Sequence, residues 1–157
     1  MNDDVERAYL NPALGALVIH SFVVEYELKA AHGPDWLLIF AAVPLVFHRP
    51  TREKLPSTPR THMSSWVNES GVRLFRYPDR MAAYADFARE ALLWALQHDL
   101  VALDNGRLHS KKPPPWSRKL LADYRSAARR VAWLFFNVTS TTTVYHLLGV
   151  RRFAHAD

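Results

Sequence analysis

The spacing of apolar residues along the chain predicts a mostly helical protein. Apolar positions recur every three to four residues in successive segments, and proline, glycine or capping residues stand at many of the segment ends. The helices expected from this pattern are residues 12–28, 36–47, 59–68, 80–98, 116–137 and a short last helix that ends at residue 148.

The first helix is expected to lie at the centre of the fold. Asn11 suits its cap, Pro12 suits its first position, and residues 32–34 (His-Gly-Pro) stop it. Apolar residues occur on nearly every side of this helix, which is typical of a helix with neighbours all round. Asp35 is expected to cap the second helix, and Pro44 to kink or end it.

A polar stretch marked by prolines, residues 48–60, follows the second helix. It is interpreted as a loop that contains one helical turn. Ser57 or Thr58 is expected to cap the third helix, and Gly71 to end it.

A β-hairpin is predicted directly after the long helix 80–98. Asn105-Gly106 separates two short runs, Val101–Asp104 and Arg107–Ser110, and a type I′ turn needs positive φ at both central residues. A long helix followed at once by a hairpin is typical of a winged helix. We therefore expect a mainly α protein of about six helices with one hairpin, winged-helix-like, as a single domain over residues 1–150 with a tail at 151–157.

Composition narrows the class of protein. The chain has 157 residues, which suits one domain, and it has no cysteine, which excludes disulfides, thiolate zinc sites and cysteine nucleophiles. Its longest apolar run, Trp36–Phe47, contains Pro44 and is shorter than the roughly 20 residues that span a bilayer. The acidic first residues do not resemble a signal peptide. We therefore expect a soluble, cytoplasmic protein that does not enter a membrane.

No motif for catalysis or cofactor binding is found in the sequence. None of the eight histidines sits in a metal-binding spacing, and there is no nucleophile elbow. With five glycines, the chain also has no glycine-rich phosphate loop. We therefore expect no enzyme activity, no cofactor and no metal, although a site assembled from distant residues would leave no such motif.

Charge is unevenly distributed along the chain. Residues 1–106 carry 10 Lys/Arg and 13 Asp/Glu, a net of −3, whereas residues 107–157 carry 10 and 2, a net of +8. Such asymmetry favours an acidic protein surface or nucleic acid as partner. The candidate nucleic-acid or acidic-partner face consists of Lys111, Lys112, Arg118, Arg125 and Arg129; the alternative is a solvated face without a partner.

The expected winged helix is better suited to protein than to DNA. A winged helix that reads DNA places polar and basic residues on the helix that enters the groove. Here the helix before the hairpin carries Asp86 and Glu90 and is mostly apolar. Protein partners are therefore preferred, and direct DNA contact is expected to be limited to the backbone.

The loop after the second helix is a candidate partner-binding site. Arg49 and Arg52 are spaced to grip a carboxylate or phosphate, with Thr51 between them, and the alternative is a solvated connector. Arg107, beside the hairpin turn, joins this candidate set because of its charge and position.

Several segments in order resemble the middle component of three-component ABC (SMC-like) systems. These segments are Asn11–Ala16, Ala42–Pro56, Ala88–His98 leading into Leu103–Leu108, Ala127–Arg130 through Phe135, Thr141–Tyr145 and Leu148–Val150. The resemblance covers the chain from Asn11 to Val150. It departs from the family pattern at Arg151-Arg152-Phe153, where a proline is expected after Gly-Val-Arg.

The family includes the small subunit of Lamassu-type bacterial defence complexes against phages and plasmids. The resemblance implies a non-catalytic adaptor that bridges an SMC-like ABC ATPase, which senses DNA, and an effector that is often a nuclease. Contact with DNA would then be mainly indirect. The alternative left open is a nucleic-acid-binding winged-helix regulator that uses the basic C-terminal helix.

Overall fold

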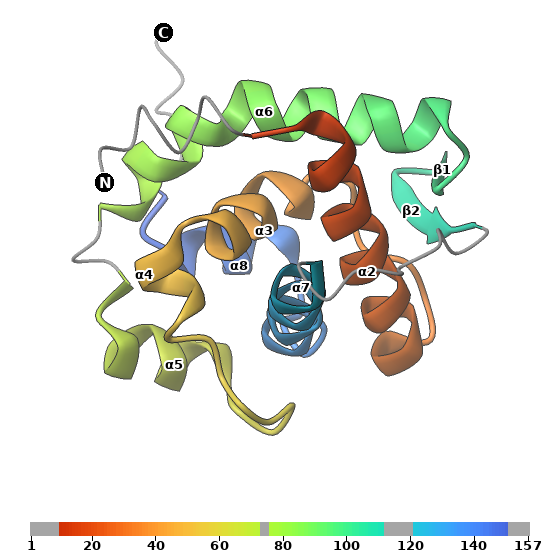
Figure 1. Ribbon diagram of the computed structural model, residues 1–157. Helices are drawn as coiled ribbons and strands as arrows, with labels where there is room; N and C mark the ends of the chain where they lie inside the picture. Colours follow the sequence, from red (N-terminus) through yellow and green to blue (C-terminus); the bar gives the residue numbers. More distant parts are fainter. Residues whose placement is uncertain (1–9, 73–75, 112–120, 151–157) are drawn as a thin grey trace, which may run out of the picture.

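The computed structural model describes residues 10–72, 76–111 and 121–150, and the fold is built from helices with one small sheet (Figure 1). The elements in chain order are α2 (Pro12–Ala30), α3 (Leu38–Phe47), α4 (Arg49–Arg52), α5 (Met63–Ser70), α6 (Tyr77–Gln97), β1 (Val101–Asp104), β2 (Arg107–Ser110), α7 (Ala122–Phe135) and α8 (Thr141–Leu147). A mainly α protein with one hairpin is therefore confirmed. Within the described ranges, none of the helices combines the length and apolar character needed to cross a bilayer.

Helix α2 is the central helix, as expected. Its cap is Asn11, whose side chain accepts a hydrogen bond from the Ala13 N–H at 2.8 Å, and Pro12 occupies the first turn. The helix packs against α6, α7, α3 and β2, so most of its faces are buried. A Cβ on Gly15 would lie 2.6 Å from the Ala91 Cβ, so glycine is needed for the close approach of α2 and α6.

Helix α3 is nearly completely buried and holds the middle of the core. It begins at Leu38, two residues later than predicted, after Asp35 Oδ1 accepts a hydrogen bond from the Leu37 N–H at 2.9 Å. Pro44 lies inside the helix, which continues to Phe47. The buried Tyr77 hydroxyl donates to the Ala41 carbonyl and ties α6 to α3.

The region between α3 and α6 differs in part from the prediction. The single helical turn expected in the loop is present as α4. Helix α5, however, starts at Met63 with His62 as its N-cap residue, so the predicted start at residue 59 with Ser57 or Thr58 as cap is wrong. The Thr58 hydroxyl instead accepts a hydrogen bond from the Arg60 N–H at 3.0 Å, which closes a local turn that competes with a helix start. Gly71, at φ 65°, ends α5 as expected.

The hairpin after α6 has the predicted turn. Strand β1 pairs antiparallel with β2, from Val101 opposite Ser110 to Asp104 opposite Arg107. Asn105 (φ 50°) and Gly106 (φ 76°) both have positive φ, which a type I′ turn requires. The hairpin is held against the body of the molecule, since β2 contacts α2 and the Leu108 N–H donates to the Pro34 carbonyl at 2.8 Å.

Helices α7 and α8 complete the core from the other side. Helix α7 packs against α2 and α3, and Phe135 meets Phe22 edge to face with ring centroids 5.9 Å apart. It ends at Phe135, two residues before the predicted end, and its predicted start at residue 116 lies outside the described residues. Ser140 caps α8 by accepting a hydrogen bond from the Thr143 N–H at 3.1 Å. The likeness to a winged helix stays a prediction.

Candidate protein-binding sites

The predicted arginine loop and helix α7 together form a charged hollow of about 320 Å³, here called the α4–α7 surface. Its lining residues come from two segments far apart in the sequence: Arg49, Arg52 and Glu53 from α4 and its end, and Asp123, Ser126, Ala127 and Arg130 from α7. Three arginines and two carboxylates thus lie around one depression. The sequence predicted the α4 half of this surface as a partner-binding site.

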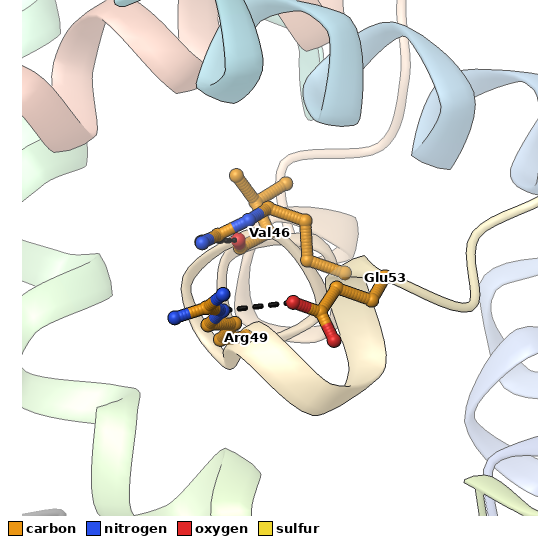
Figure 2. A network of polar contacts seen from close by, with 4 residues as sticks. Val46, Arg49 and Glu53 are labelled. Carbon is orange, nitrogen blue, oxygen red and sulfur yellow. Dashed lines mark hydrogen bonds and ion pairs between the residues drawn. The ribbon is translucent and has the colours of Figure 1, made fainter. Parts of the chain in front are cut away.

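Helix α4 is fixed by contacts within its own segment. Figure 2 shows Arg49 and Glu53 joined by an ion pair of 2.8 Å, and Val46, whose carbonyl accepts a hydrogen bond of 2.9 Å from Arg52 Nη1. Thr51 is 1% exposed, and its hydroxyl is hydrogen-bonded to His48 Nδ1. The Thr51 side chain therefore lies beneath the surface, where it positions the turn that carries Arg49.

The arginines of this surface are held to different degrees. Arg52 stabilises the fold, because its guanidinium bonds to the Val46 carbonyl and also lies 5.0 Å from the centre of the Tyr124 ring on α7. Arg49 is paired with Glu53, but its side chain is 71% exposed. Arg130 makes no hydrogen bond or ion pair with any described residue. Arg49 and Arg130 are therefore the cations best placed to meet a carboxylate or phosphate from outside.

The sequence contains a signal for the α7 half of this surface. Asp123, Ser126 or Ala127, and Arg130 are spaced by three and four residues, which places them on one face of a helix. Nothing local indicates that this face lies beside α4, because that depends on how α7 packs.

Arg107, the fourth residue of the predicted partner-binding set, lies elsewhere. Strand β2, which carries it, and helix α4 are on opposite sides of the molecule in Figure 1. Arg107 Nη1 donates to the Gly33 carbonyl at 2.8 Å and lies 2.8 Å from His32 Nδ1. The predicted set is therefore divided between two regions of the structure.

Arg107 borders a larger cleft of about 620 Å³, here called the hairpin–α8 cleft. Four segments line it: α2 with Tyr26, residues 32–38 from the α2–α3 connection into α3, the hairpin with Arg107, and residues 135–144 from the end of α7 into α8. Asp35 Oδ2 accepts a hydrogen bond from the Thr141 hydroxyl at 3.1 Å, which joins two of these segments. Sequence analysis did not predict this cleft.

The candidate nucleic-acid face is partly neutralised by carboxylates of the chain itself. Arg129 Nε lies 3.4 Å from Glu25 Oε2, and the Trp133 indole N–H donates to Glu25 Oε1 at 2.7 Å. Lys111 Nζ lies 3.6 Å from Asp99 Oδ1. Arg125 is exposed on α7. Lys112 and Arg118 lie outside the described residues.

Arg125 and Arg129 line a third, smaller hollow of about 250 Å³ beside the buried His20. His20 Nε2 is 3.2 Å from the Lys111 carbonyl oxygen, while its Nδ1 is buried and has no hydrogen bond within the described ranges. Burial lowers the pKa of His20, and the positive charge of Arg125 acts in the same direction. Across the described residues, no three His, Cys, Asp or Glu side chains are placed to hold a metal ion together.

Comparison with known proteins identifies the family. Residues 2–152 match the family described as ABC-three component (ABC-3C) system Middle Component 3, whereas curated proteins and solved structures gave no match. The family match covers both candidate regions and nearly the whole sequence. The resemblance to a middle component is thereby confirmed, and the chain belongs to the ABC-3C Middle Component 3 family.

Proposed function

We propose that this protein is a non-catalytic adaptor that bridges an SMC-like ABC ATPase and an effector, often a nuclease, in a bacterial defence complex against phages and plasmids. Its family describes one component of three, and a middle component is expected to bind the others. Lamassu-type complexes are the setting in which we place it. The proposal includes no catalytic step, since the sequence carries no motif for one.

The α4–α7 surface is the observation that carries this proposal. Arg49 and Glu53 come from the α4 segment, and Asp123 and Arg130 come from α7; together they line one depression. The α4 turn is already held in place by the hydrogen bond from Arg52 to the Val46 carbonyl. Arginine is enriched at protein interfaces, and mixed charges of fixed geometry select a complementary partner. A preformed surface also loses less conformational entropy on binding than a mobile loop.

The test is co-purification of this chain with the ABC ATPase and the effector encoded beside it. We expect the wild-type chain to form a stable complex with both. The double variant Arg49→Glu with Arg130→Glu is expected to weaken one of the two contacts by at least about tenfold, because buried interfacial charges that lose their partner are costly.

Arg89→Glu is the matched control for this experiment. Arg89 is an exposed arginine of α6 in an ion pair with Asp86, so reversing its charge changes the net charge without touching the α4–α7 surface. Arg52 is left intact because it supports the fold. A wild-type chain that stays monomeric and retains neither partner would overturn the proposed function.

A nucleic-acid-binding regulator is the second candidate, favoured by the charge of +8 over residues 107–157. In that case affinity for duplex DNA should fall steeply with salt, and Arg125→Glu with Arg129→Glu should abolish it. The pairing of Arg129 with Glu25 counts against this candidate. DNA affinity that survives the double variant would show that this face does not bind DNA.

A further inference from the structure

The hollow beside His20, between α2 and α7, differs in its chemistry from the two larger regions. Its lining residues, which define what is here called the α2–α7 hollow, are His20, Ser21, Val24, Glu25 and Leu28 of α2 with Arg125 and Arg129 of α7. Its volume of about 250 Å³ is below the roughly 300 Å³ at which pockets for small molecules begin. It therefore suits one side chain presented by a larger molecule.

Two polar atoms of this hollow are buried without a hydrogen bond. His20 is 3% exposed and Ser21 is 5% exposed, and neither His20 Nδ1 nor Ser21 Oγ bonds to any described residue. A buried polar atom that has lost water without gaining a partner is unfavourable. Because the two residues are consecutive on α2 and line the same hollow, an occupant there would meet both of them.

The bond at the other ring nitrogen fixes the tautomer of His20. Nε2 lies 3.2 Å from the Lys111 carbonyl oxygen, and a carbonyl oxygen only accepts, so Nε2 carries a hydrogen and donates it. Burial lowers the pKa of His20 below 6.5, so the ring is neutral at pH 7. In a neutral ring the second nitrogen is an acceptor. His20 Nδ1 therefore needs a donor.

The charges of the hollow restrict what that donor can be. A carboxylate has no hydrogen to donate to the ring nitrogen. An ammonium or guanidinium would lie beside Arg125 and Arg129, which repel it. Glu25 is already engaged, because its carboxylate accepts from the Trp133 indole and pairs with Arg129. A neutral hydroxyl or carboxamide meets none of these objections, and it both donates and accepts, so it can serve the ring nitrogen and the serine hydroxyl.

The rim of the hollow adds an apolar contact. Leu28 is 74% exposed and Val24 is half-buried, so a partner that covers them removes apolar surface from water. Exposed side chains such as Leu28 and Arg125 commonly change rotamer when a partner binds, which opens the way to the buried atoms. An apolar rim over a neutral polar floor fits a protein side chain better than a phosphate of nucleic acid.

We propose that the α2–α7 hollow is a further docking site of the adaptor, which takes a neutral hydroxyl or carboxamide side chain from a protein partner. That side chain donates to His20 Nδ1 and accepts from the Ser21 hydroxyl, while neighbouring residues of the partner cover Leu28. This inference rests on the proposed adaptor function. It adds a contact that does not depend on the arginines of the α4–α7 surface.

The test measures the affinity of the full chain for the purified ATPase and the purified effector in separate titrations. Ser21→Ala removes only the unpartnered hydroxyl, and we expect it to weaken one partner about fivefold, the value of one neutral hydrogen bond. Alanine is the better helix former and the hydroxyl has no bond in the free protein, so the melting temperature should stay the same or rise. A serine that only supports the fold would give the opposite pattern.

Two variants of His20 separate the roles of its ring nitrogens. His20→Gln keeps a donor near the position of Nε2 and loses the acceptor at Nδ1, so it should weaken the same partner about fivefold. His20→Asn keeps an acceptor near the position of Nδ1 and loses the bond to the Lys111 carbonyl. It should therefore lower the melting temperature more than His20→Gln does and retain more of the affinity.

Ser70→Ala is the matched control for Ser21→Ala. The Ser70 hydroxyl is also buried, but it accepts a hydrogen bond from the Val72 N–H at 3.3 Å at the end of α5. Its removal should lower the melting temperature without changing either affinity. This contrast separates partner binding from a role in folding.

The remaining outcomes distinguish this inference from the adaptor function. If Ser21→Ala and His20→Gln bind both partners like the wild type, the hollow is not a docking site, although the adaptor function stands. If the two variants instead lose affinity for a DNA duplex, the occupant is nucleic acid and the proposed protein contact is wrong. If the wild-type chain binds neither partner, the adaptor function fails and this inference fails with it.

Discussion

The α4–α7 surface and the hairpin–α8 cleft are two hollows that the same small protein builds in different ways. The first concentrates charge on one turn of helix and one helix face, with an exposed Arg49 and a half-buried Arg130. The second is larger, draws on four segments and places the ring of Tyr26 near the exposed Arg107. The difference teaches that one small helical core can carry both an electrostatic surface and a shaped cleft.

The two regions also differ in what holds them in place. The turn at α4 is stabilised mostly by neighbours in sequence, such as Arg52 on Val46. The cleft depends on long-range contacts, such as Arg107 on Gly33 and Thr141 on Asp35. Substitutions in these contacts should therefore disturb one region without the other, whereas a substitution that moves α7 should disturb both. The following predictions run from the largest expected effect to the smallest.

Gly33→Ala should break the cleft and leave the α4–α7 surface intact. A Cβ at Gly33 would lie 1.9 Å from the Leu108 carbonyl oxygen, so the hairpin must move away from the body of the protein. We expect a loss of about 3 kcal/mol of unfolding free energy, measured by urea denaturation. Gly106→Ala is the control, because nothing lies within 4 Å of its Cβ position and only its φ of 76° opposes the change; a loss of about 1 kcal/mol is expected there. Equal losses in the two variants would contradict this account.

Glu25→Ala should disturb both regions, because Glu25 helps to fix α7, which contributes Arg130 to one and Phe135 to the other. Its carboxylate holds the Trp133 indole N–H and the Arg129 guanidinium, and its side chain is 8% exposed. We expect a loss of about 2 kcal/mol in unfolding free energy, since the indole N–H loses its partner. Glu25→Gln, which keeps an oxygen acceptor, should lose less. An unchanged stability in Glu25→Ala would show that α7 is positioned by packing alone.

Arg52→Ala and Arg49→Ala should show which arginine of the α4–α7 surface stabilises the fold and which is mainly exposed. Arg52 loses a hydrogen bond to Val46 and a stacked contact with Tyr124, and we expect a cost of about 1 kcal/mol. Arg49 loses an exposed ion pair with Glu53, which is expected to cost about 0.5 kcal/mol or less. Thermal unfolding of the two variants checks the order. A larger effect of Arg49→Ala on stability would reverse the roles assigned to these arginines.

Mild acid should weaken the cleft side before the α4–α7 surface. Burial lowers the pKa of His20 below its ordinary value of 6.5, so the unfolded chain takes up this proton at a higher pH than the folded protein does. The stabilising contribution is complete above pH 6.5 and is lost as pH falls through the lowered pKa. His20 contacts the carbonyl of Lys111, the residue that follows β2, so protonation of His20 should weaken the packing of the hairpin.

The measurement for His20 is the urea midpoint of the wild type and of His20→Gln between pH 8 and pH 5. The wild type should lose stability faster than the variant below pH 6.5. This is the smallest effect predicted here, and parallel pH curves for the two proteins would show that His20 does not contribute to acid sensitivity.

Local signals in the sequence predicted the elements of the fold better than their contacts. Asn105-Gly106 and Asn11-Pro12 act through the backbone of their own segment, and the hairpin and the start of α2 were predicted correctly. The predicted start of α5 is too early, because Ser57 or Thr58 is expected as its cap, whereas the Thr58 hydroxyl closes a turn with Arg60. The resemblance to middle components, built on motif order, identified the family that the comparison confirmed.

The candidate sites could be predicted only in part, for the same physical reason. Arg49 and Arg52 bond to Glu53 and Val46, which are close to them in the sequence, so the loop could be found by its pattern, whereas the contact of Arg52 with Tyr124 could not. Tyr26 and Asp35 become neighbours of Arg107 only after the hairpin has packed against α2. The ion pair between Glu25 and Arg129 spans two helices, and the net charge of a segment does not reveal it.

The way the hairpin is anchored has a mechanical consequence. The Leu108 N–H is bonded to the Pro34 carbonyl, the Trp36 N–H to the Gly106 carbonyl, and the Ser110 hydroxyl to Glu27 at 3.2 Å. Tension applied at the turn would thus pass into α2 and the residues before α3, because the turn and strand β2 are fastened to the 34–36 backbone and to the central helix. The hairpin would act as a stiff lever, and a force on its turn would be transmitted into the core of the protein without being absorbed by a flexible loop.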